Sequence, residues 1–314
     1  MERRALGGSG IHVSALSLGS WRTFEWIPRE QGLAVMRAAR EAGVDFLDDA
    51  RYDDRTGTAP IPTGYSEVVF GELFRAARWK RDEVVVASKL WWEWWPEQSA
   101  AEELDASLSR MGLDHVDLIY AERPPAGLEV EQVVDDVVGL LRVGRARAWG
   151  VLNWRAELVA EAAAVAERKG VPPPCAAQLA YSLAYPEVAE DTAMAAALDV
   201  AGASVVASAV LAGGALTGKY AHGVHGRLTA ELDVPRWQRP LALGERLDAF
   251  ARDLDTTPAR LAIAFALANR RVASALFGAT TQGQVLENAG AVELLDRLDD
   301  GDLERLRSLA VGDG

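Results

Sequence analysis

Short apolar runs alternate with longer segments of helical periodicity along most of the 314-residue chain. The pattern over residues 4–19 predicts two short strands joined by a turn at 7–10, followed by a strand that ends at Gly19. Further strands are predicted over residues 44–48, 84–88, 116–121, 147–152, 176–178, 204–209 and 272–277. Helices are predicted over residues 28–42, 66–77, 99–111, 128–143, 156–169, 187–201, 241–254, 258–270, 282–292 and 300–310, with long loops over 51–66 and 212–240.

This alternation of strands and helices indicates a parallel sheet with right-handed crossover connections. Eight such units in roughly 250–300 residues predict a (β/α)8 TIM barrel. The segment before Gly19 adds an N-terminal β-hairpin, and the absence of a break in composition predicts one domain over residues 1–314. A doubly wound open sheet is the alternative, but no Gly-x-Gly-x-x-Gly fingerprint lies between a strand and a helix near the start.

Polar residues stand at the ends of five consecutive predicted strands. They are Asp48, Lys89, Glu122, Asn153 and Gln178, and each follows an apolar run. In a barrel the carboxyl ends of the strands meet at one mouth, where active sites are built. We therefore expect these side chains to form a ring around that mouth. The alternative is a structural ion pair with amides that cap loops.

Composition restricts the partners and the compartment. The net charge of −13 argues against nucleic acid and anionic membranes. No run of 18 apolar residues and no signal peptide is evident, and a single cysteine, Cys175, fits a reducing compartment. We expect a cytoplasmic protein, either a monomer or a homo-oligomer, that binds a small molecule. His222 and His225 lack further ligands nearby, so no metal site is predicted.

Several ordered segments resemble one known family, the aldo-keto reductases. The matching segments are GGSGIHVSALSLGSW, GVDFLDDA, VVVASKL, GRARAWGVLNW, AAQLAYS, LAGGALTGKY and LFGATTQGQVLEN, which together cover nearly the whole chain. The resemblance implies a (β/α)8 barrel that binds NAD(P)H in an extended form. It places the catalytic aspartate at Asp48 and the catalytic lysine at Lys89. It places cofactor contacts at Gly19, Asn153, Gln178, Leu211, Gly213, Lys219, Gln284, Glu287 and Asn288.

The first departure from the family pattern is Glu122, where the family usually has histidine. A glutamate that burial keeps protonated donates a strong hydrogen bond to a substrate oxygen. The 5β-steroid reductases of the family have glutamate at this position and reduce a conjugated C=C bond. This resemblance implies reduction of an activated alkene as an alternative to carbonyl reduction. A solvated glutamate, or one paired with Arg123 or Lys89, is the opposing interpretation.

The second departure concerns the catalytic tyrosine. The family places it five residues after the aspartate, which is Asp53 here, whereas Tyr52 lies one residue earlier and Tyr65 follows an insertion. We favour Tyr52, Tyr65 is the other candidate, and a site without a catalytic tyrosine is the third alternative. A lysine beside the phenol is expected to lower the tyrosine pKa by stabilising the phenolate. The phenol would then exchange its proton with the substrate.

The third departure lies in the predicted cofactor clamp. Leu152 replaces the serine that the family has before Asn153, and Ser208 replaces the aromatic residue that stacks on the nicotinamide. No basic residue for a 2′-phosphate is evident near Thr280 and Thr281. The resemblance implies NADPH as cofactor, and NADH stays open as the alternative.

An aromatic cluster follows Lys89 on the next predicted loop. Four indoles lie in the stretch Trp91-Trp92-Glu93-Trp94-Trp95. Exposed aromatic surface of this size usually marks a binding site, so we predict a pocket for a flat or apolar, or cationic, substrate. Trp91, Trp92, Trp154 and Trp21 are the predicted substrate contacts. Packing of this loop onto neighbouring helices is the alternative.

The sequence therefore predicts an NAD(P)H-dependent oxidoreductase with Asp48, Tyr52, Lys89 and Glu122 as catalytic residues. Its substrate would be a carbonyl or a conjugated C=C or C=N bond of an apolar or aromatic small molecule. The alternative function is a catalytically weak or inactive nucleotide-binding regulator that resembles channel β-subunits.

Overall fold

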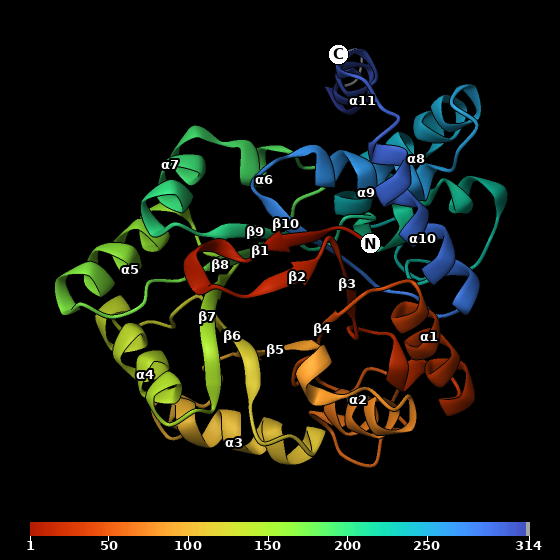
Figure 1. The fold of residues 1–314 in the computed structure, drawn as a ribbon. Coiled ribbons are helices and arrows are strands. Elements are labelled where there is room, and N and C mark those ends of the chain that lie inside the picture. The colour runs from red at the N-terminus through yellow and green to blue at the C-terminus, as the bar shows by residue number, and fades with distance from the viewer. Residues whose placement is uncertain (312–314) are drawn as a thin grey trace.

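Eight parallel strands close into a barrel in the computed structural model, which describes residues 1–311 (Figure 1). Around the barrel the strands follow one another in the order β10-β3-β4-β5-β6-β7-β8-β9. Their bounds are β3 (Leu16–Gly19), β4 (Phe46–Asp48), β5 (Val85–Leu90), β6 (Val116–Glu122), β7 (Ala146–Leu152), β8 (Ala176–Leu179), β9 (Ser204–Ala207) and β10 (Val272–Phe277). The predicted (β/α)8 barrel is confirmed.

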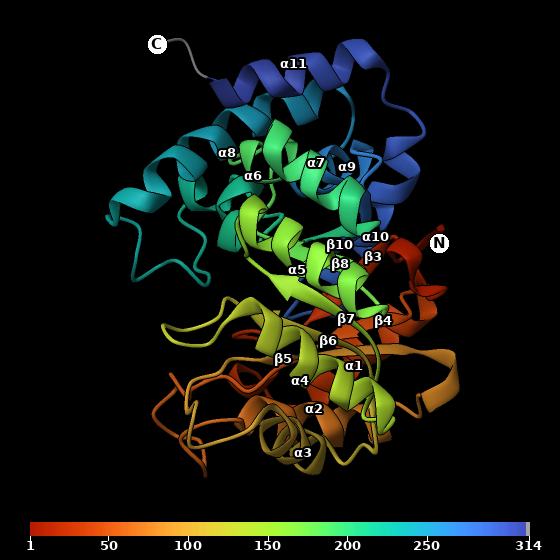
Figure 2. The same cartoon turned by 90° about the vertical axis from the view of Figure 1, so that its left-hand side faces the viewer.

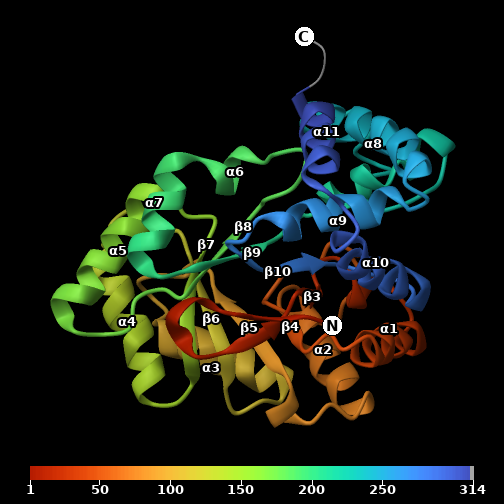
Figure 3. The same cartoon turned by 45° about the horizontal axis from the view of Figure 1, so that its top comes forward.

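Helices surround the strands on the outside (Figure 3). They are α1 (Arg29–Glu41), α2 (Tyr65–Ala76), α3 (Ala100–Met111), α4 (Val130–Arg142), α5 (Ala156–Lys169), α6 (Glu187–Glu190), α7 (Thr192–Ala201), α8 (Pro235–Asp253), α9 (Pro258–Ala268), α10 (Gln282–Leu295) and α11 (Asp300–Val311). A capping box begins α3, because the side chains of Ser99 and Glu102 bond reciprocally to the backbone there. Over residues 1–311, none of these helices has both the length and the apolar character needed to cross a membrane.

The N-terminal hairpin closes one end of the barrel. Strands β1 (Arg3–Ala5) and β2 (His12–Ser14) pair antiparallel, and Figure 1 shows them lying across the near end of the strands. Leu6, Ile11 and Val13 are buried there against the barrel interior. Arg4 fastens the hairpin to the last strand by donating to the carbonyls of Leu267 at 3.0 Å and Val272 at 2.9 Å.

The opposite end of the barrel stays open to the loops that follow the strands. Figure 2 shows these loops on the left and the N-terminal hairpin on the right. The barrel interior between the two ends is filled by apolar side chains from alternate strand positions, including Phe46, Val85, Leu118, Ala148 and Val206. The side chains that could carry chemistry therefore lie at the loop end.

Tyr120 fills the barrel directly beneath the loop end, and its position requires a glycine on the neighbouring strand. Tyr120 is fully buried on β6, and its register partner on β7 is Gly150. A Cβ atom at Gly150 would lie 3.1 Å from the Tyr120 ring and only 2.4 Å from the carbonyl oxygen of Ala176. Any larger residue there would displace the phenol or the neighbouring strand.

The structure corrects some predicted boundaries. Residues 212–240 are not a loop throughout, because short 3-10 turns form at Ala212–Thr217 and Lys219–His222 and because α8 begins at Pro235. Proline is favoured in the first turn of a helix, where its missing N–H would have no partner. The predicted helix over 187–201 is two helices, because the Asp191 carboxylate caps α7 by accepting from the N–H groups of Ala193 and Met194. Strand β5 extends to Leu90 and therefore includes Lys89.

Candidate active site

A buried ion pair occupies the loop end of the barrel. Lys89 Nζ lies 2.5 Å from Asp48 Oδ1, and the two side chains are 3% and 2% exposed. Gln178 donates from Nε2 to the other carboxylate oxygen of Asp48 at 2.8 Å, reaching across the barrel from β8. Three of the five predicted strand-end residues thus form one hydrogen-bonded cluster.

Tyr52 lies over this cluster. Lys89 Nζ is 5.9 Å from the centre of the Tyr52 ring, and the edge of Trp91 packs against the phenol with ring centres 5.9 Å apart. The predicted lowering of the Tyr52 pKa is not seen: burial raises it well above its usual value, and the charges of Asp48 and Asp49 add to the increase. Asp48 already neutralises Lys89, so little positive charge is left to stabilise a phenolate.

Tyr65, the other candidate, stands apart from the cluster. It is the first residue of α2, and its hydroxyl accepts a hydrogen bond from Arg29 on α1 at 2.8 Å. The same guanidinium lies 5.5 Å from the centre of the Tyr65 ring. Tyr65 is therefore engaged between two outer helices, and of these two candidates Tyr52 is the one that the structure brings to Lys89.

Glu122 ends β6 and is half-buried at the mouth. Burial raises the pKa of its carboxyl, although the charges of Arg123 and Lys89 act in the opposite direction. Among residues 1–311, no ion pair joins Glu122 to Arg123, Lys89 or any other cation. The structure therefore does not form the salt-bridged alternative among these residues, and burial shifts the carboxyl pKa in the direction that favours its neutral form.

The tryptophan loop divides between core and surface. Trp92 is 3% exposed and donates its indole N–H to the carbonyl of Glu122 at 3.0 Å, so we remove it from the predicted substrate contacts. Glu103 on α3 holds the loop by accepting from the backbone N–H groups of Trp91 at 2.8 Å and Trp92 at 3.3 Å. Trp94 is 43% exposed, with the Arg51 guanidinium 4.2 Å from its ring centre.

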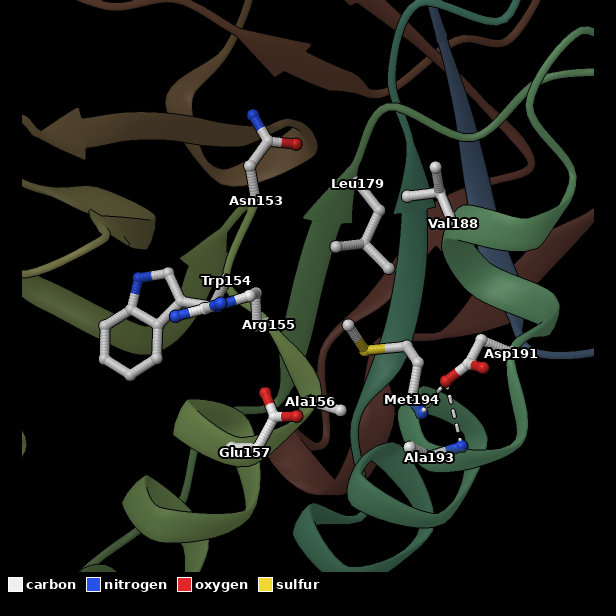
Figure 4. A pocket seen from close by; sticks show the side chains of 10 residues that line it. All are labelled: Asn153, Trp154, Arg155, Ala156, Glu157, Leu179, Val188, Asp191, Ala193 and Met194. Carbon is white, nitrogen blue, oxygen red and sulfur yellow. Dashed lines mark hydrogen bonds between the residues drawn. The ribbon is translucent and has the colours of Figure 1, made fainter.

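The other two predicted substrate contacts differ in exposure. Trp21 is 44% exposed and has the guanidinium groups of Arg22 and Arg227 at 4.9 and 5.4 Å from its ring centre. Trp154 is 2% exposed and lines a pocket of about 370 Å³ at the ends of β7 and β8. Figure 4 shows the Asn153 amide on the rim of this pocket, pointing away from Met194 and Asp191. Asn153 itself has a φ of 52°, a left-handed conformation that asparagine tolerates.

The predicted cofactor segments gather at the same mouth. Gly19 ends β3 beside β10, where a Cβ atom would meet the Leu276 side chain at 3.2 Å. Leu211 opens the turn in which Gly213 and Gly214 have φ angles of 67° and 94°. Lys219 folds back over this turn, with Nζ 3.2 Å from where a Gly214 Cβ would lie. Burial lowers the Lys219 pKa, and residues 1–311 provide no carboxylate partner for it.

Arg227 is a basic residue of the mouth that the sequence analysis did not single out. It comes from the loop before α8 and donates at 3.3 Å to both the carbonyl of Arg22 and the hydroxyl of Thr23. One of its Nη atoms lies 3.1 Å from where a Cβ of Gly278 would be, just beyond β10. Burial lowers the pKa of this guanidinium, and no carboxylate within residues 1–311 pairs with it. A half-buried cation without an ion-pair partner among the described residues suits an anion site.

The last predicted cofactor segment begins α10. Gln284 accepts at Oε1 from the backbone N–H of Thr280 at 2.7 Å, and Gln31 donates to the Thr280 carbonyl at 2.5 Å. Glu287 is partly exposed on the same helix, and Asn288 is buried at 3% exposure. Two residues depart from the family pattern here. Leu152 is buried in the barrel interior, and Ser208 donates its hydroxyl to the Leu179 carbonyl at 3.0 Å.

These side chains suit a dinucleotide cofactor. Lys219 and Arg227 offer positive charge without a carboxylate ion-pair partner in residues 1–311, and Gly213 and Gly214 leave room for a close backbone approach. Gln178 uses its N–H group on Asp48, so its carbonyl oxygen is left to accept from a carboxamide, with Asn153 on the neighbouring strand end. The donor set fits two phosphates and an amide.

Comparisons with known proteins point in the same direction. The sequence model of the family described as "Aldo/keto reductase family" matches residues 15–311. A protein of Oryza sativa subsp. japonica named "Probable voltage-gated potassium channel subunit beta" is 32% identical over 314 residues, with 95% of this chain and 93% of that protein covered. The family match includes the barrel and every residue of the mouth described above.

Proposed function

The chain belongs to the aldo/keto reductase family, and from this premise we propose that it is an NADPH-dependent reductase of small molecules. Its substrate would be an apolar or aromatic compound with a carbonyl or a conjugated C=C or C=N bond. The observation that carries this proposal is the buried Asp48–Lys89 pair beneath the phenol of Tyr52. Such a cluster holds and directs a proton at an otherwise apolar barrel mouth.

In this proposal each side chain of the cluster has a role. NADPH, when bound, supplies the hydride. Tyr52 donates the proton to the substrate, and its raised pKa keeps the phenol protonated until that transfer. Lys89 would offset only part of the charge on the phenolate that remains, because Asp48 pairs with Lys89 and holds it in place. Gln178 and Asn153 would orient the carboxamide, while Lys219 and Arg227 would bind the phosphates.

Glu122 would set which bond is reduced. A protonated carboxyl at this point donates a hydrogen bond to the substrate oxygen and withdraws electrons from a conjugated alkene. Its raised pKa and its lack of a cation partner within residues 1–311 support the uncharged form. We therefore propose conjugated C=C reduction as the preferred reaction when the substrate offers both bonds.

Cinnamaldehyde tests this choice because it carries both bonds on an aromatic ring. We expect steady NADPH consumption with hydrocinnamaldehyde as the main product, identified by chromatography. The Glu122→His variant should shift the product towards cinnamyl alcohol. Glu97→His, an exposed glutamate beyond the tryptophan loop, is the matched control and should leave the products unchanged. An unchanged product ratio in Glu122→His contradicts the proposed role of Glu122.

The second candidate function is a nucleotide-binding regulator with little or no turnover. The name of the Oryza sativa relative, which describes a probable potassium channel β-subunit, favours this function. NADPH would quench tryptophan fluorescence under both functions. Tight binding without turnover of aldehydes, quinones or enones would reject the enzyme and support the regulator.

A further inference from the structure

Asp49 lies behind the active-site wall, next in sequence to Asp48. Successive side chains leave a strand on opposite faces, so Asp48 points into the barrel and Asp49 points towards the outer helices. Asp49 is fully buried, and Oδ1 accepts a hydrogen bond from the Ser20 hydroxyl at the end of β3. Its second oxygen, Oδ2, is also buried and has no partner among residues 1–311. A buried carboxylate oxygen without a donor is costly, so this atom needs an explanation.

Glu67, in the first turn of α2, also has a carboxylate oxygen without a hydrogen-bond partner among the described residues. It is fully buried, and Oε2 accepts from Arg110 Nε on α3 at 2.5 Å. Its other oxygen, Oε1, is likewise buried without a partner among residues 1–311. Ser66, the residue before Glu67, donates to the carbonyl of Ala50, the residue after Asp49, at 2.7 Å, so the segments that carry the two carboxyl groups are adjacent. In agreement, Glu67 is the charge that raises the pKa of Asp49 most. Two carboxylates side by side in a dry interior repel unless a proton lies between them.

We propose that Asp49 and Glu67 share one proton, with Asp49 donating from Oδ2 to Oε1 of Glu67, and that this bond positions the turn that carries Tyr52. The assignment satisfies both unpartnered oxygens at once. The proton resides on Asp49, because Glu67 has the Arg110 guanidinium beside it and Asp49 has no ion-pair partner among residues 1–311. Burial and the charge of Glu67 raise the pKa of Asp49 well above its usual value, in agreement with this arrangement.

The turn between Asp49 and Tyr52 is fastened to α2 along its length. Ser66 donates its hydroxyl to the Ala50 carbonyl at 2.7 Å, and the Gly64 N–H donates to the Tyr52 carbonyl at 2.8 Å. The carboxyl pair is the innermost of these links. Its loss would leave the outer links in place but free the start of the turn, and the phenol would shift relative to Lys89.

The pair also makes the position of Tyr52 depend on pH. The charged or titratable groups that act on it are Lys89 from β5, Arg51 and Tyr52 from the turn, and Arg110 from α3, with the hydroxyls of Ser20 and Ser107 as hydrogen-bond partners. When alkaline conditions remove the shared proton, Arg110 compensates only one of the two negative charges. Repulsion then opens the link between the turn and α2.

A direct test is infrared difference spectroscopy of the full chain over a pH titration. We expect the C=O stretch of a buried protonated carboxyl at neutral pH in the parent and in Asp53→Asn, an exposed aspartate of the same loop. The Asp49→Asn variant should lose this band, and the Glu122→Gln variant identifies any separate band of the Glu122 carboxyl, whose pKa burial also raises. If the parent shows no such band, or Asp49→Asn retains it, the shared proton is rejected. This measurement needs no substrate, so it is independent of the proposed reductase function.

The positioning role rests on the proposed function and is tested by turnover. Asparagine keeps an N–H donor for Glu67, so Asp49→Asn should retain most of the kcat at neutral pH. The kcat of the parent should fall at alkaline pH as the shared proton is lost, and Asp49→Asn should not show this fall. Asp49→Ala removes the link and should lower kcat on the order of 100-fold without weakening NADPH binding. Equal kcat values for folded Asp49→Asn and Asp49→Ala overturn the role, as does an unchanged alkaline limb in Asp49→Asn. An inactive parent with an intact carboxyl band would instead reject the reductase.

Discussion

Removing Lys89 should destabilise the protein as well as inactivate it. The Lys89→Met variant keeps much of the side-chain volume but leaves Asp48 without its cation in a site where both residues are almost completely buried. An unpaired buried charge lacks the solvation that water or a counter-ion would provide. The hydrogen bond from Gln178 to Asp48 at 2.8 Å persists and offsets part of the loss.

The size of the effect follows from these contacts. Breaking a buried ion pair from one side costs about 3–5 kcal/mol, and the remaining Gln178 bond places this case near 3 kcal/mol. A chain of 314 residues has an unfolding entropy of about 0.66 kcal/mol/K near its melting temperature. The Tm of Lys89→Met should therefore fall by roughly 4–5 °C.

Thermal unfolding followed by circular dichroism, without cofactor, measures this shift. Lys80→Met is the matched control, because Lys80 is 67% exposed and its ion pair with Glu83 lies on the surface, so its Tm should change by only about 1 °C. Adding Asp48→Asn to Lys89→Met neutralises the stranded charge and should recover part of the loss. A Tm for Lys89→Met equal to that of Lys80→Met would refute the reasoning.

Three further predictions concern the mouth. Arg227→Ala should weaken NADPH binding about 10- to 100-fold in a fluorescence titration, because charged hydrogen bonds contribute roughly 1.5–3 kcal/mol, and an unchanged Kd would exclude Arg227 from the phosphate site. Because burial raises the Glu122 pKa, alkene reduction should be fully active at low pH and fall as pH rises through that pKa. Glu122→Gln should abolish this limb of the kcat/KM profile, and a limb that persists would assign it to another group. Tyr52→Phe should lower kcat about 10²- to 10⁴-fold while Tyr65→Phe leaves it nearly unchanged, and the reverse order would make Tyr65 the proton donor.

Local sequence signals predict most of the fold because the barrel is built from short, repeated units. Each strand is an apolar run of a few residues, and glycine or a capping residue usually marks the helix end or start, as at Gly170 and Ser99. These signals depend only on neighbours in the chain. The start of α8 was missed because Pro240 lies inside that helix, and a proline there ordinarily predicts its end.

The site was less predictable because its properties depend on contacts distant in sequence. The strand-end rule identified Asp48 and Lys89, since all parallel strands end at the same mouth. It could not show that Asp48 would neutralise Lys89 and leave the Tyr52 pKa high. The burial of Trp92 was equally hidden, because adjacent tryptophans look alike in sequence and only the path of the loop separates core from surface.

The pairing of Asp49 with Glu67 shows the same limit. The two residues lie on different elements, and both have ordinary exposed interpretations in the sequence, one in an acidic stretch and one in a first helical turn. Only the coordinates reveal that each has one oxygen without a donor. Arg227 was missed for a related reason, because the loop that carries it has no periodicity to indicate where the side chain points.

The N-terminal hairpin has a consequence for synthesis of the chain on the ribosome. Arg4 bonds to Val272, which is separated from it by 268 positions, so the hairpin waits for partners that are made 268 residues later. At ordinary elongation rates that wait is roughly 15–50 s. During it Leu6, Ile11 and Val13 have no barrel to enter, and their apolar surface is open to chaperones or to another nascent chain. The segment that seals the finished barrel is thus the one that needs protection for longest while the protein is being made.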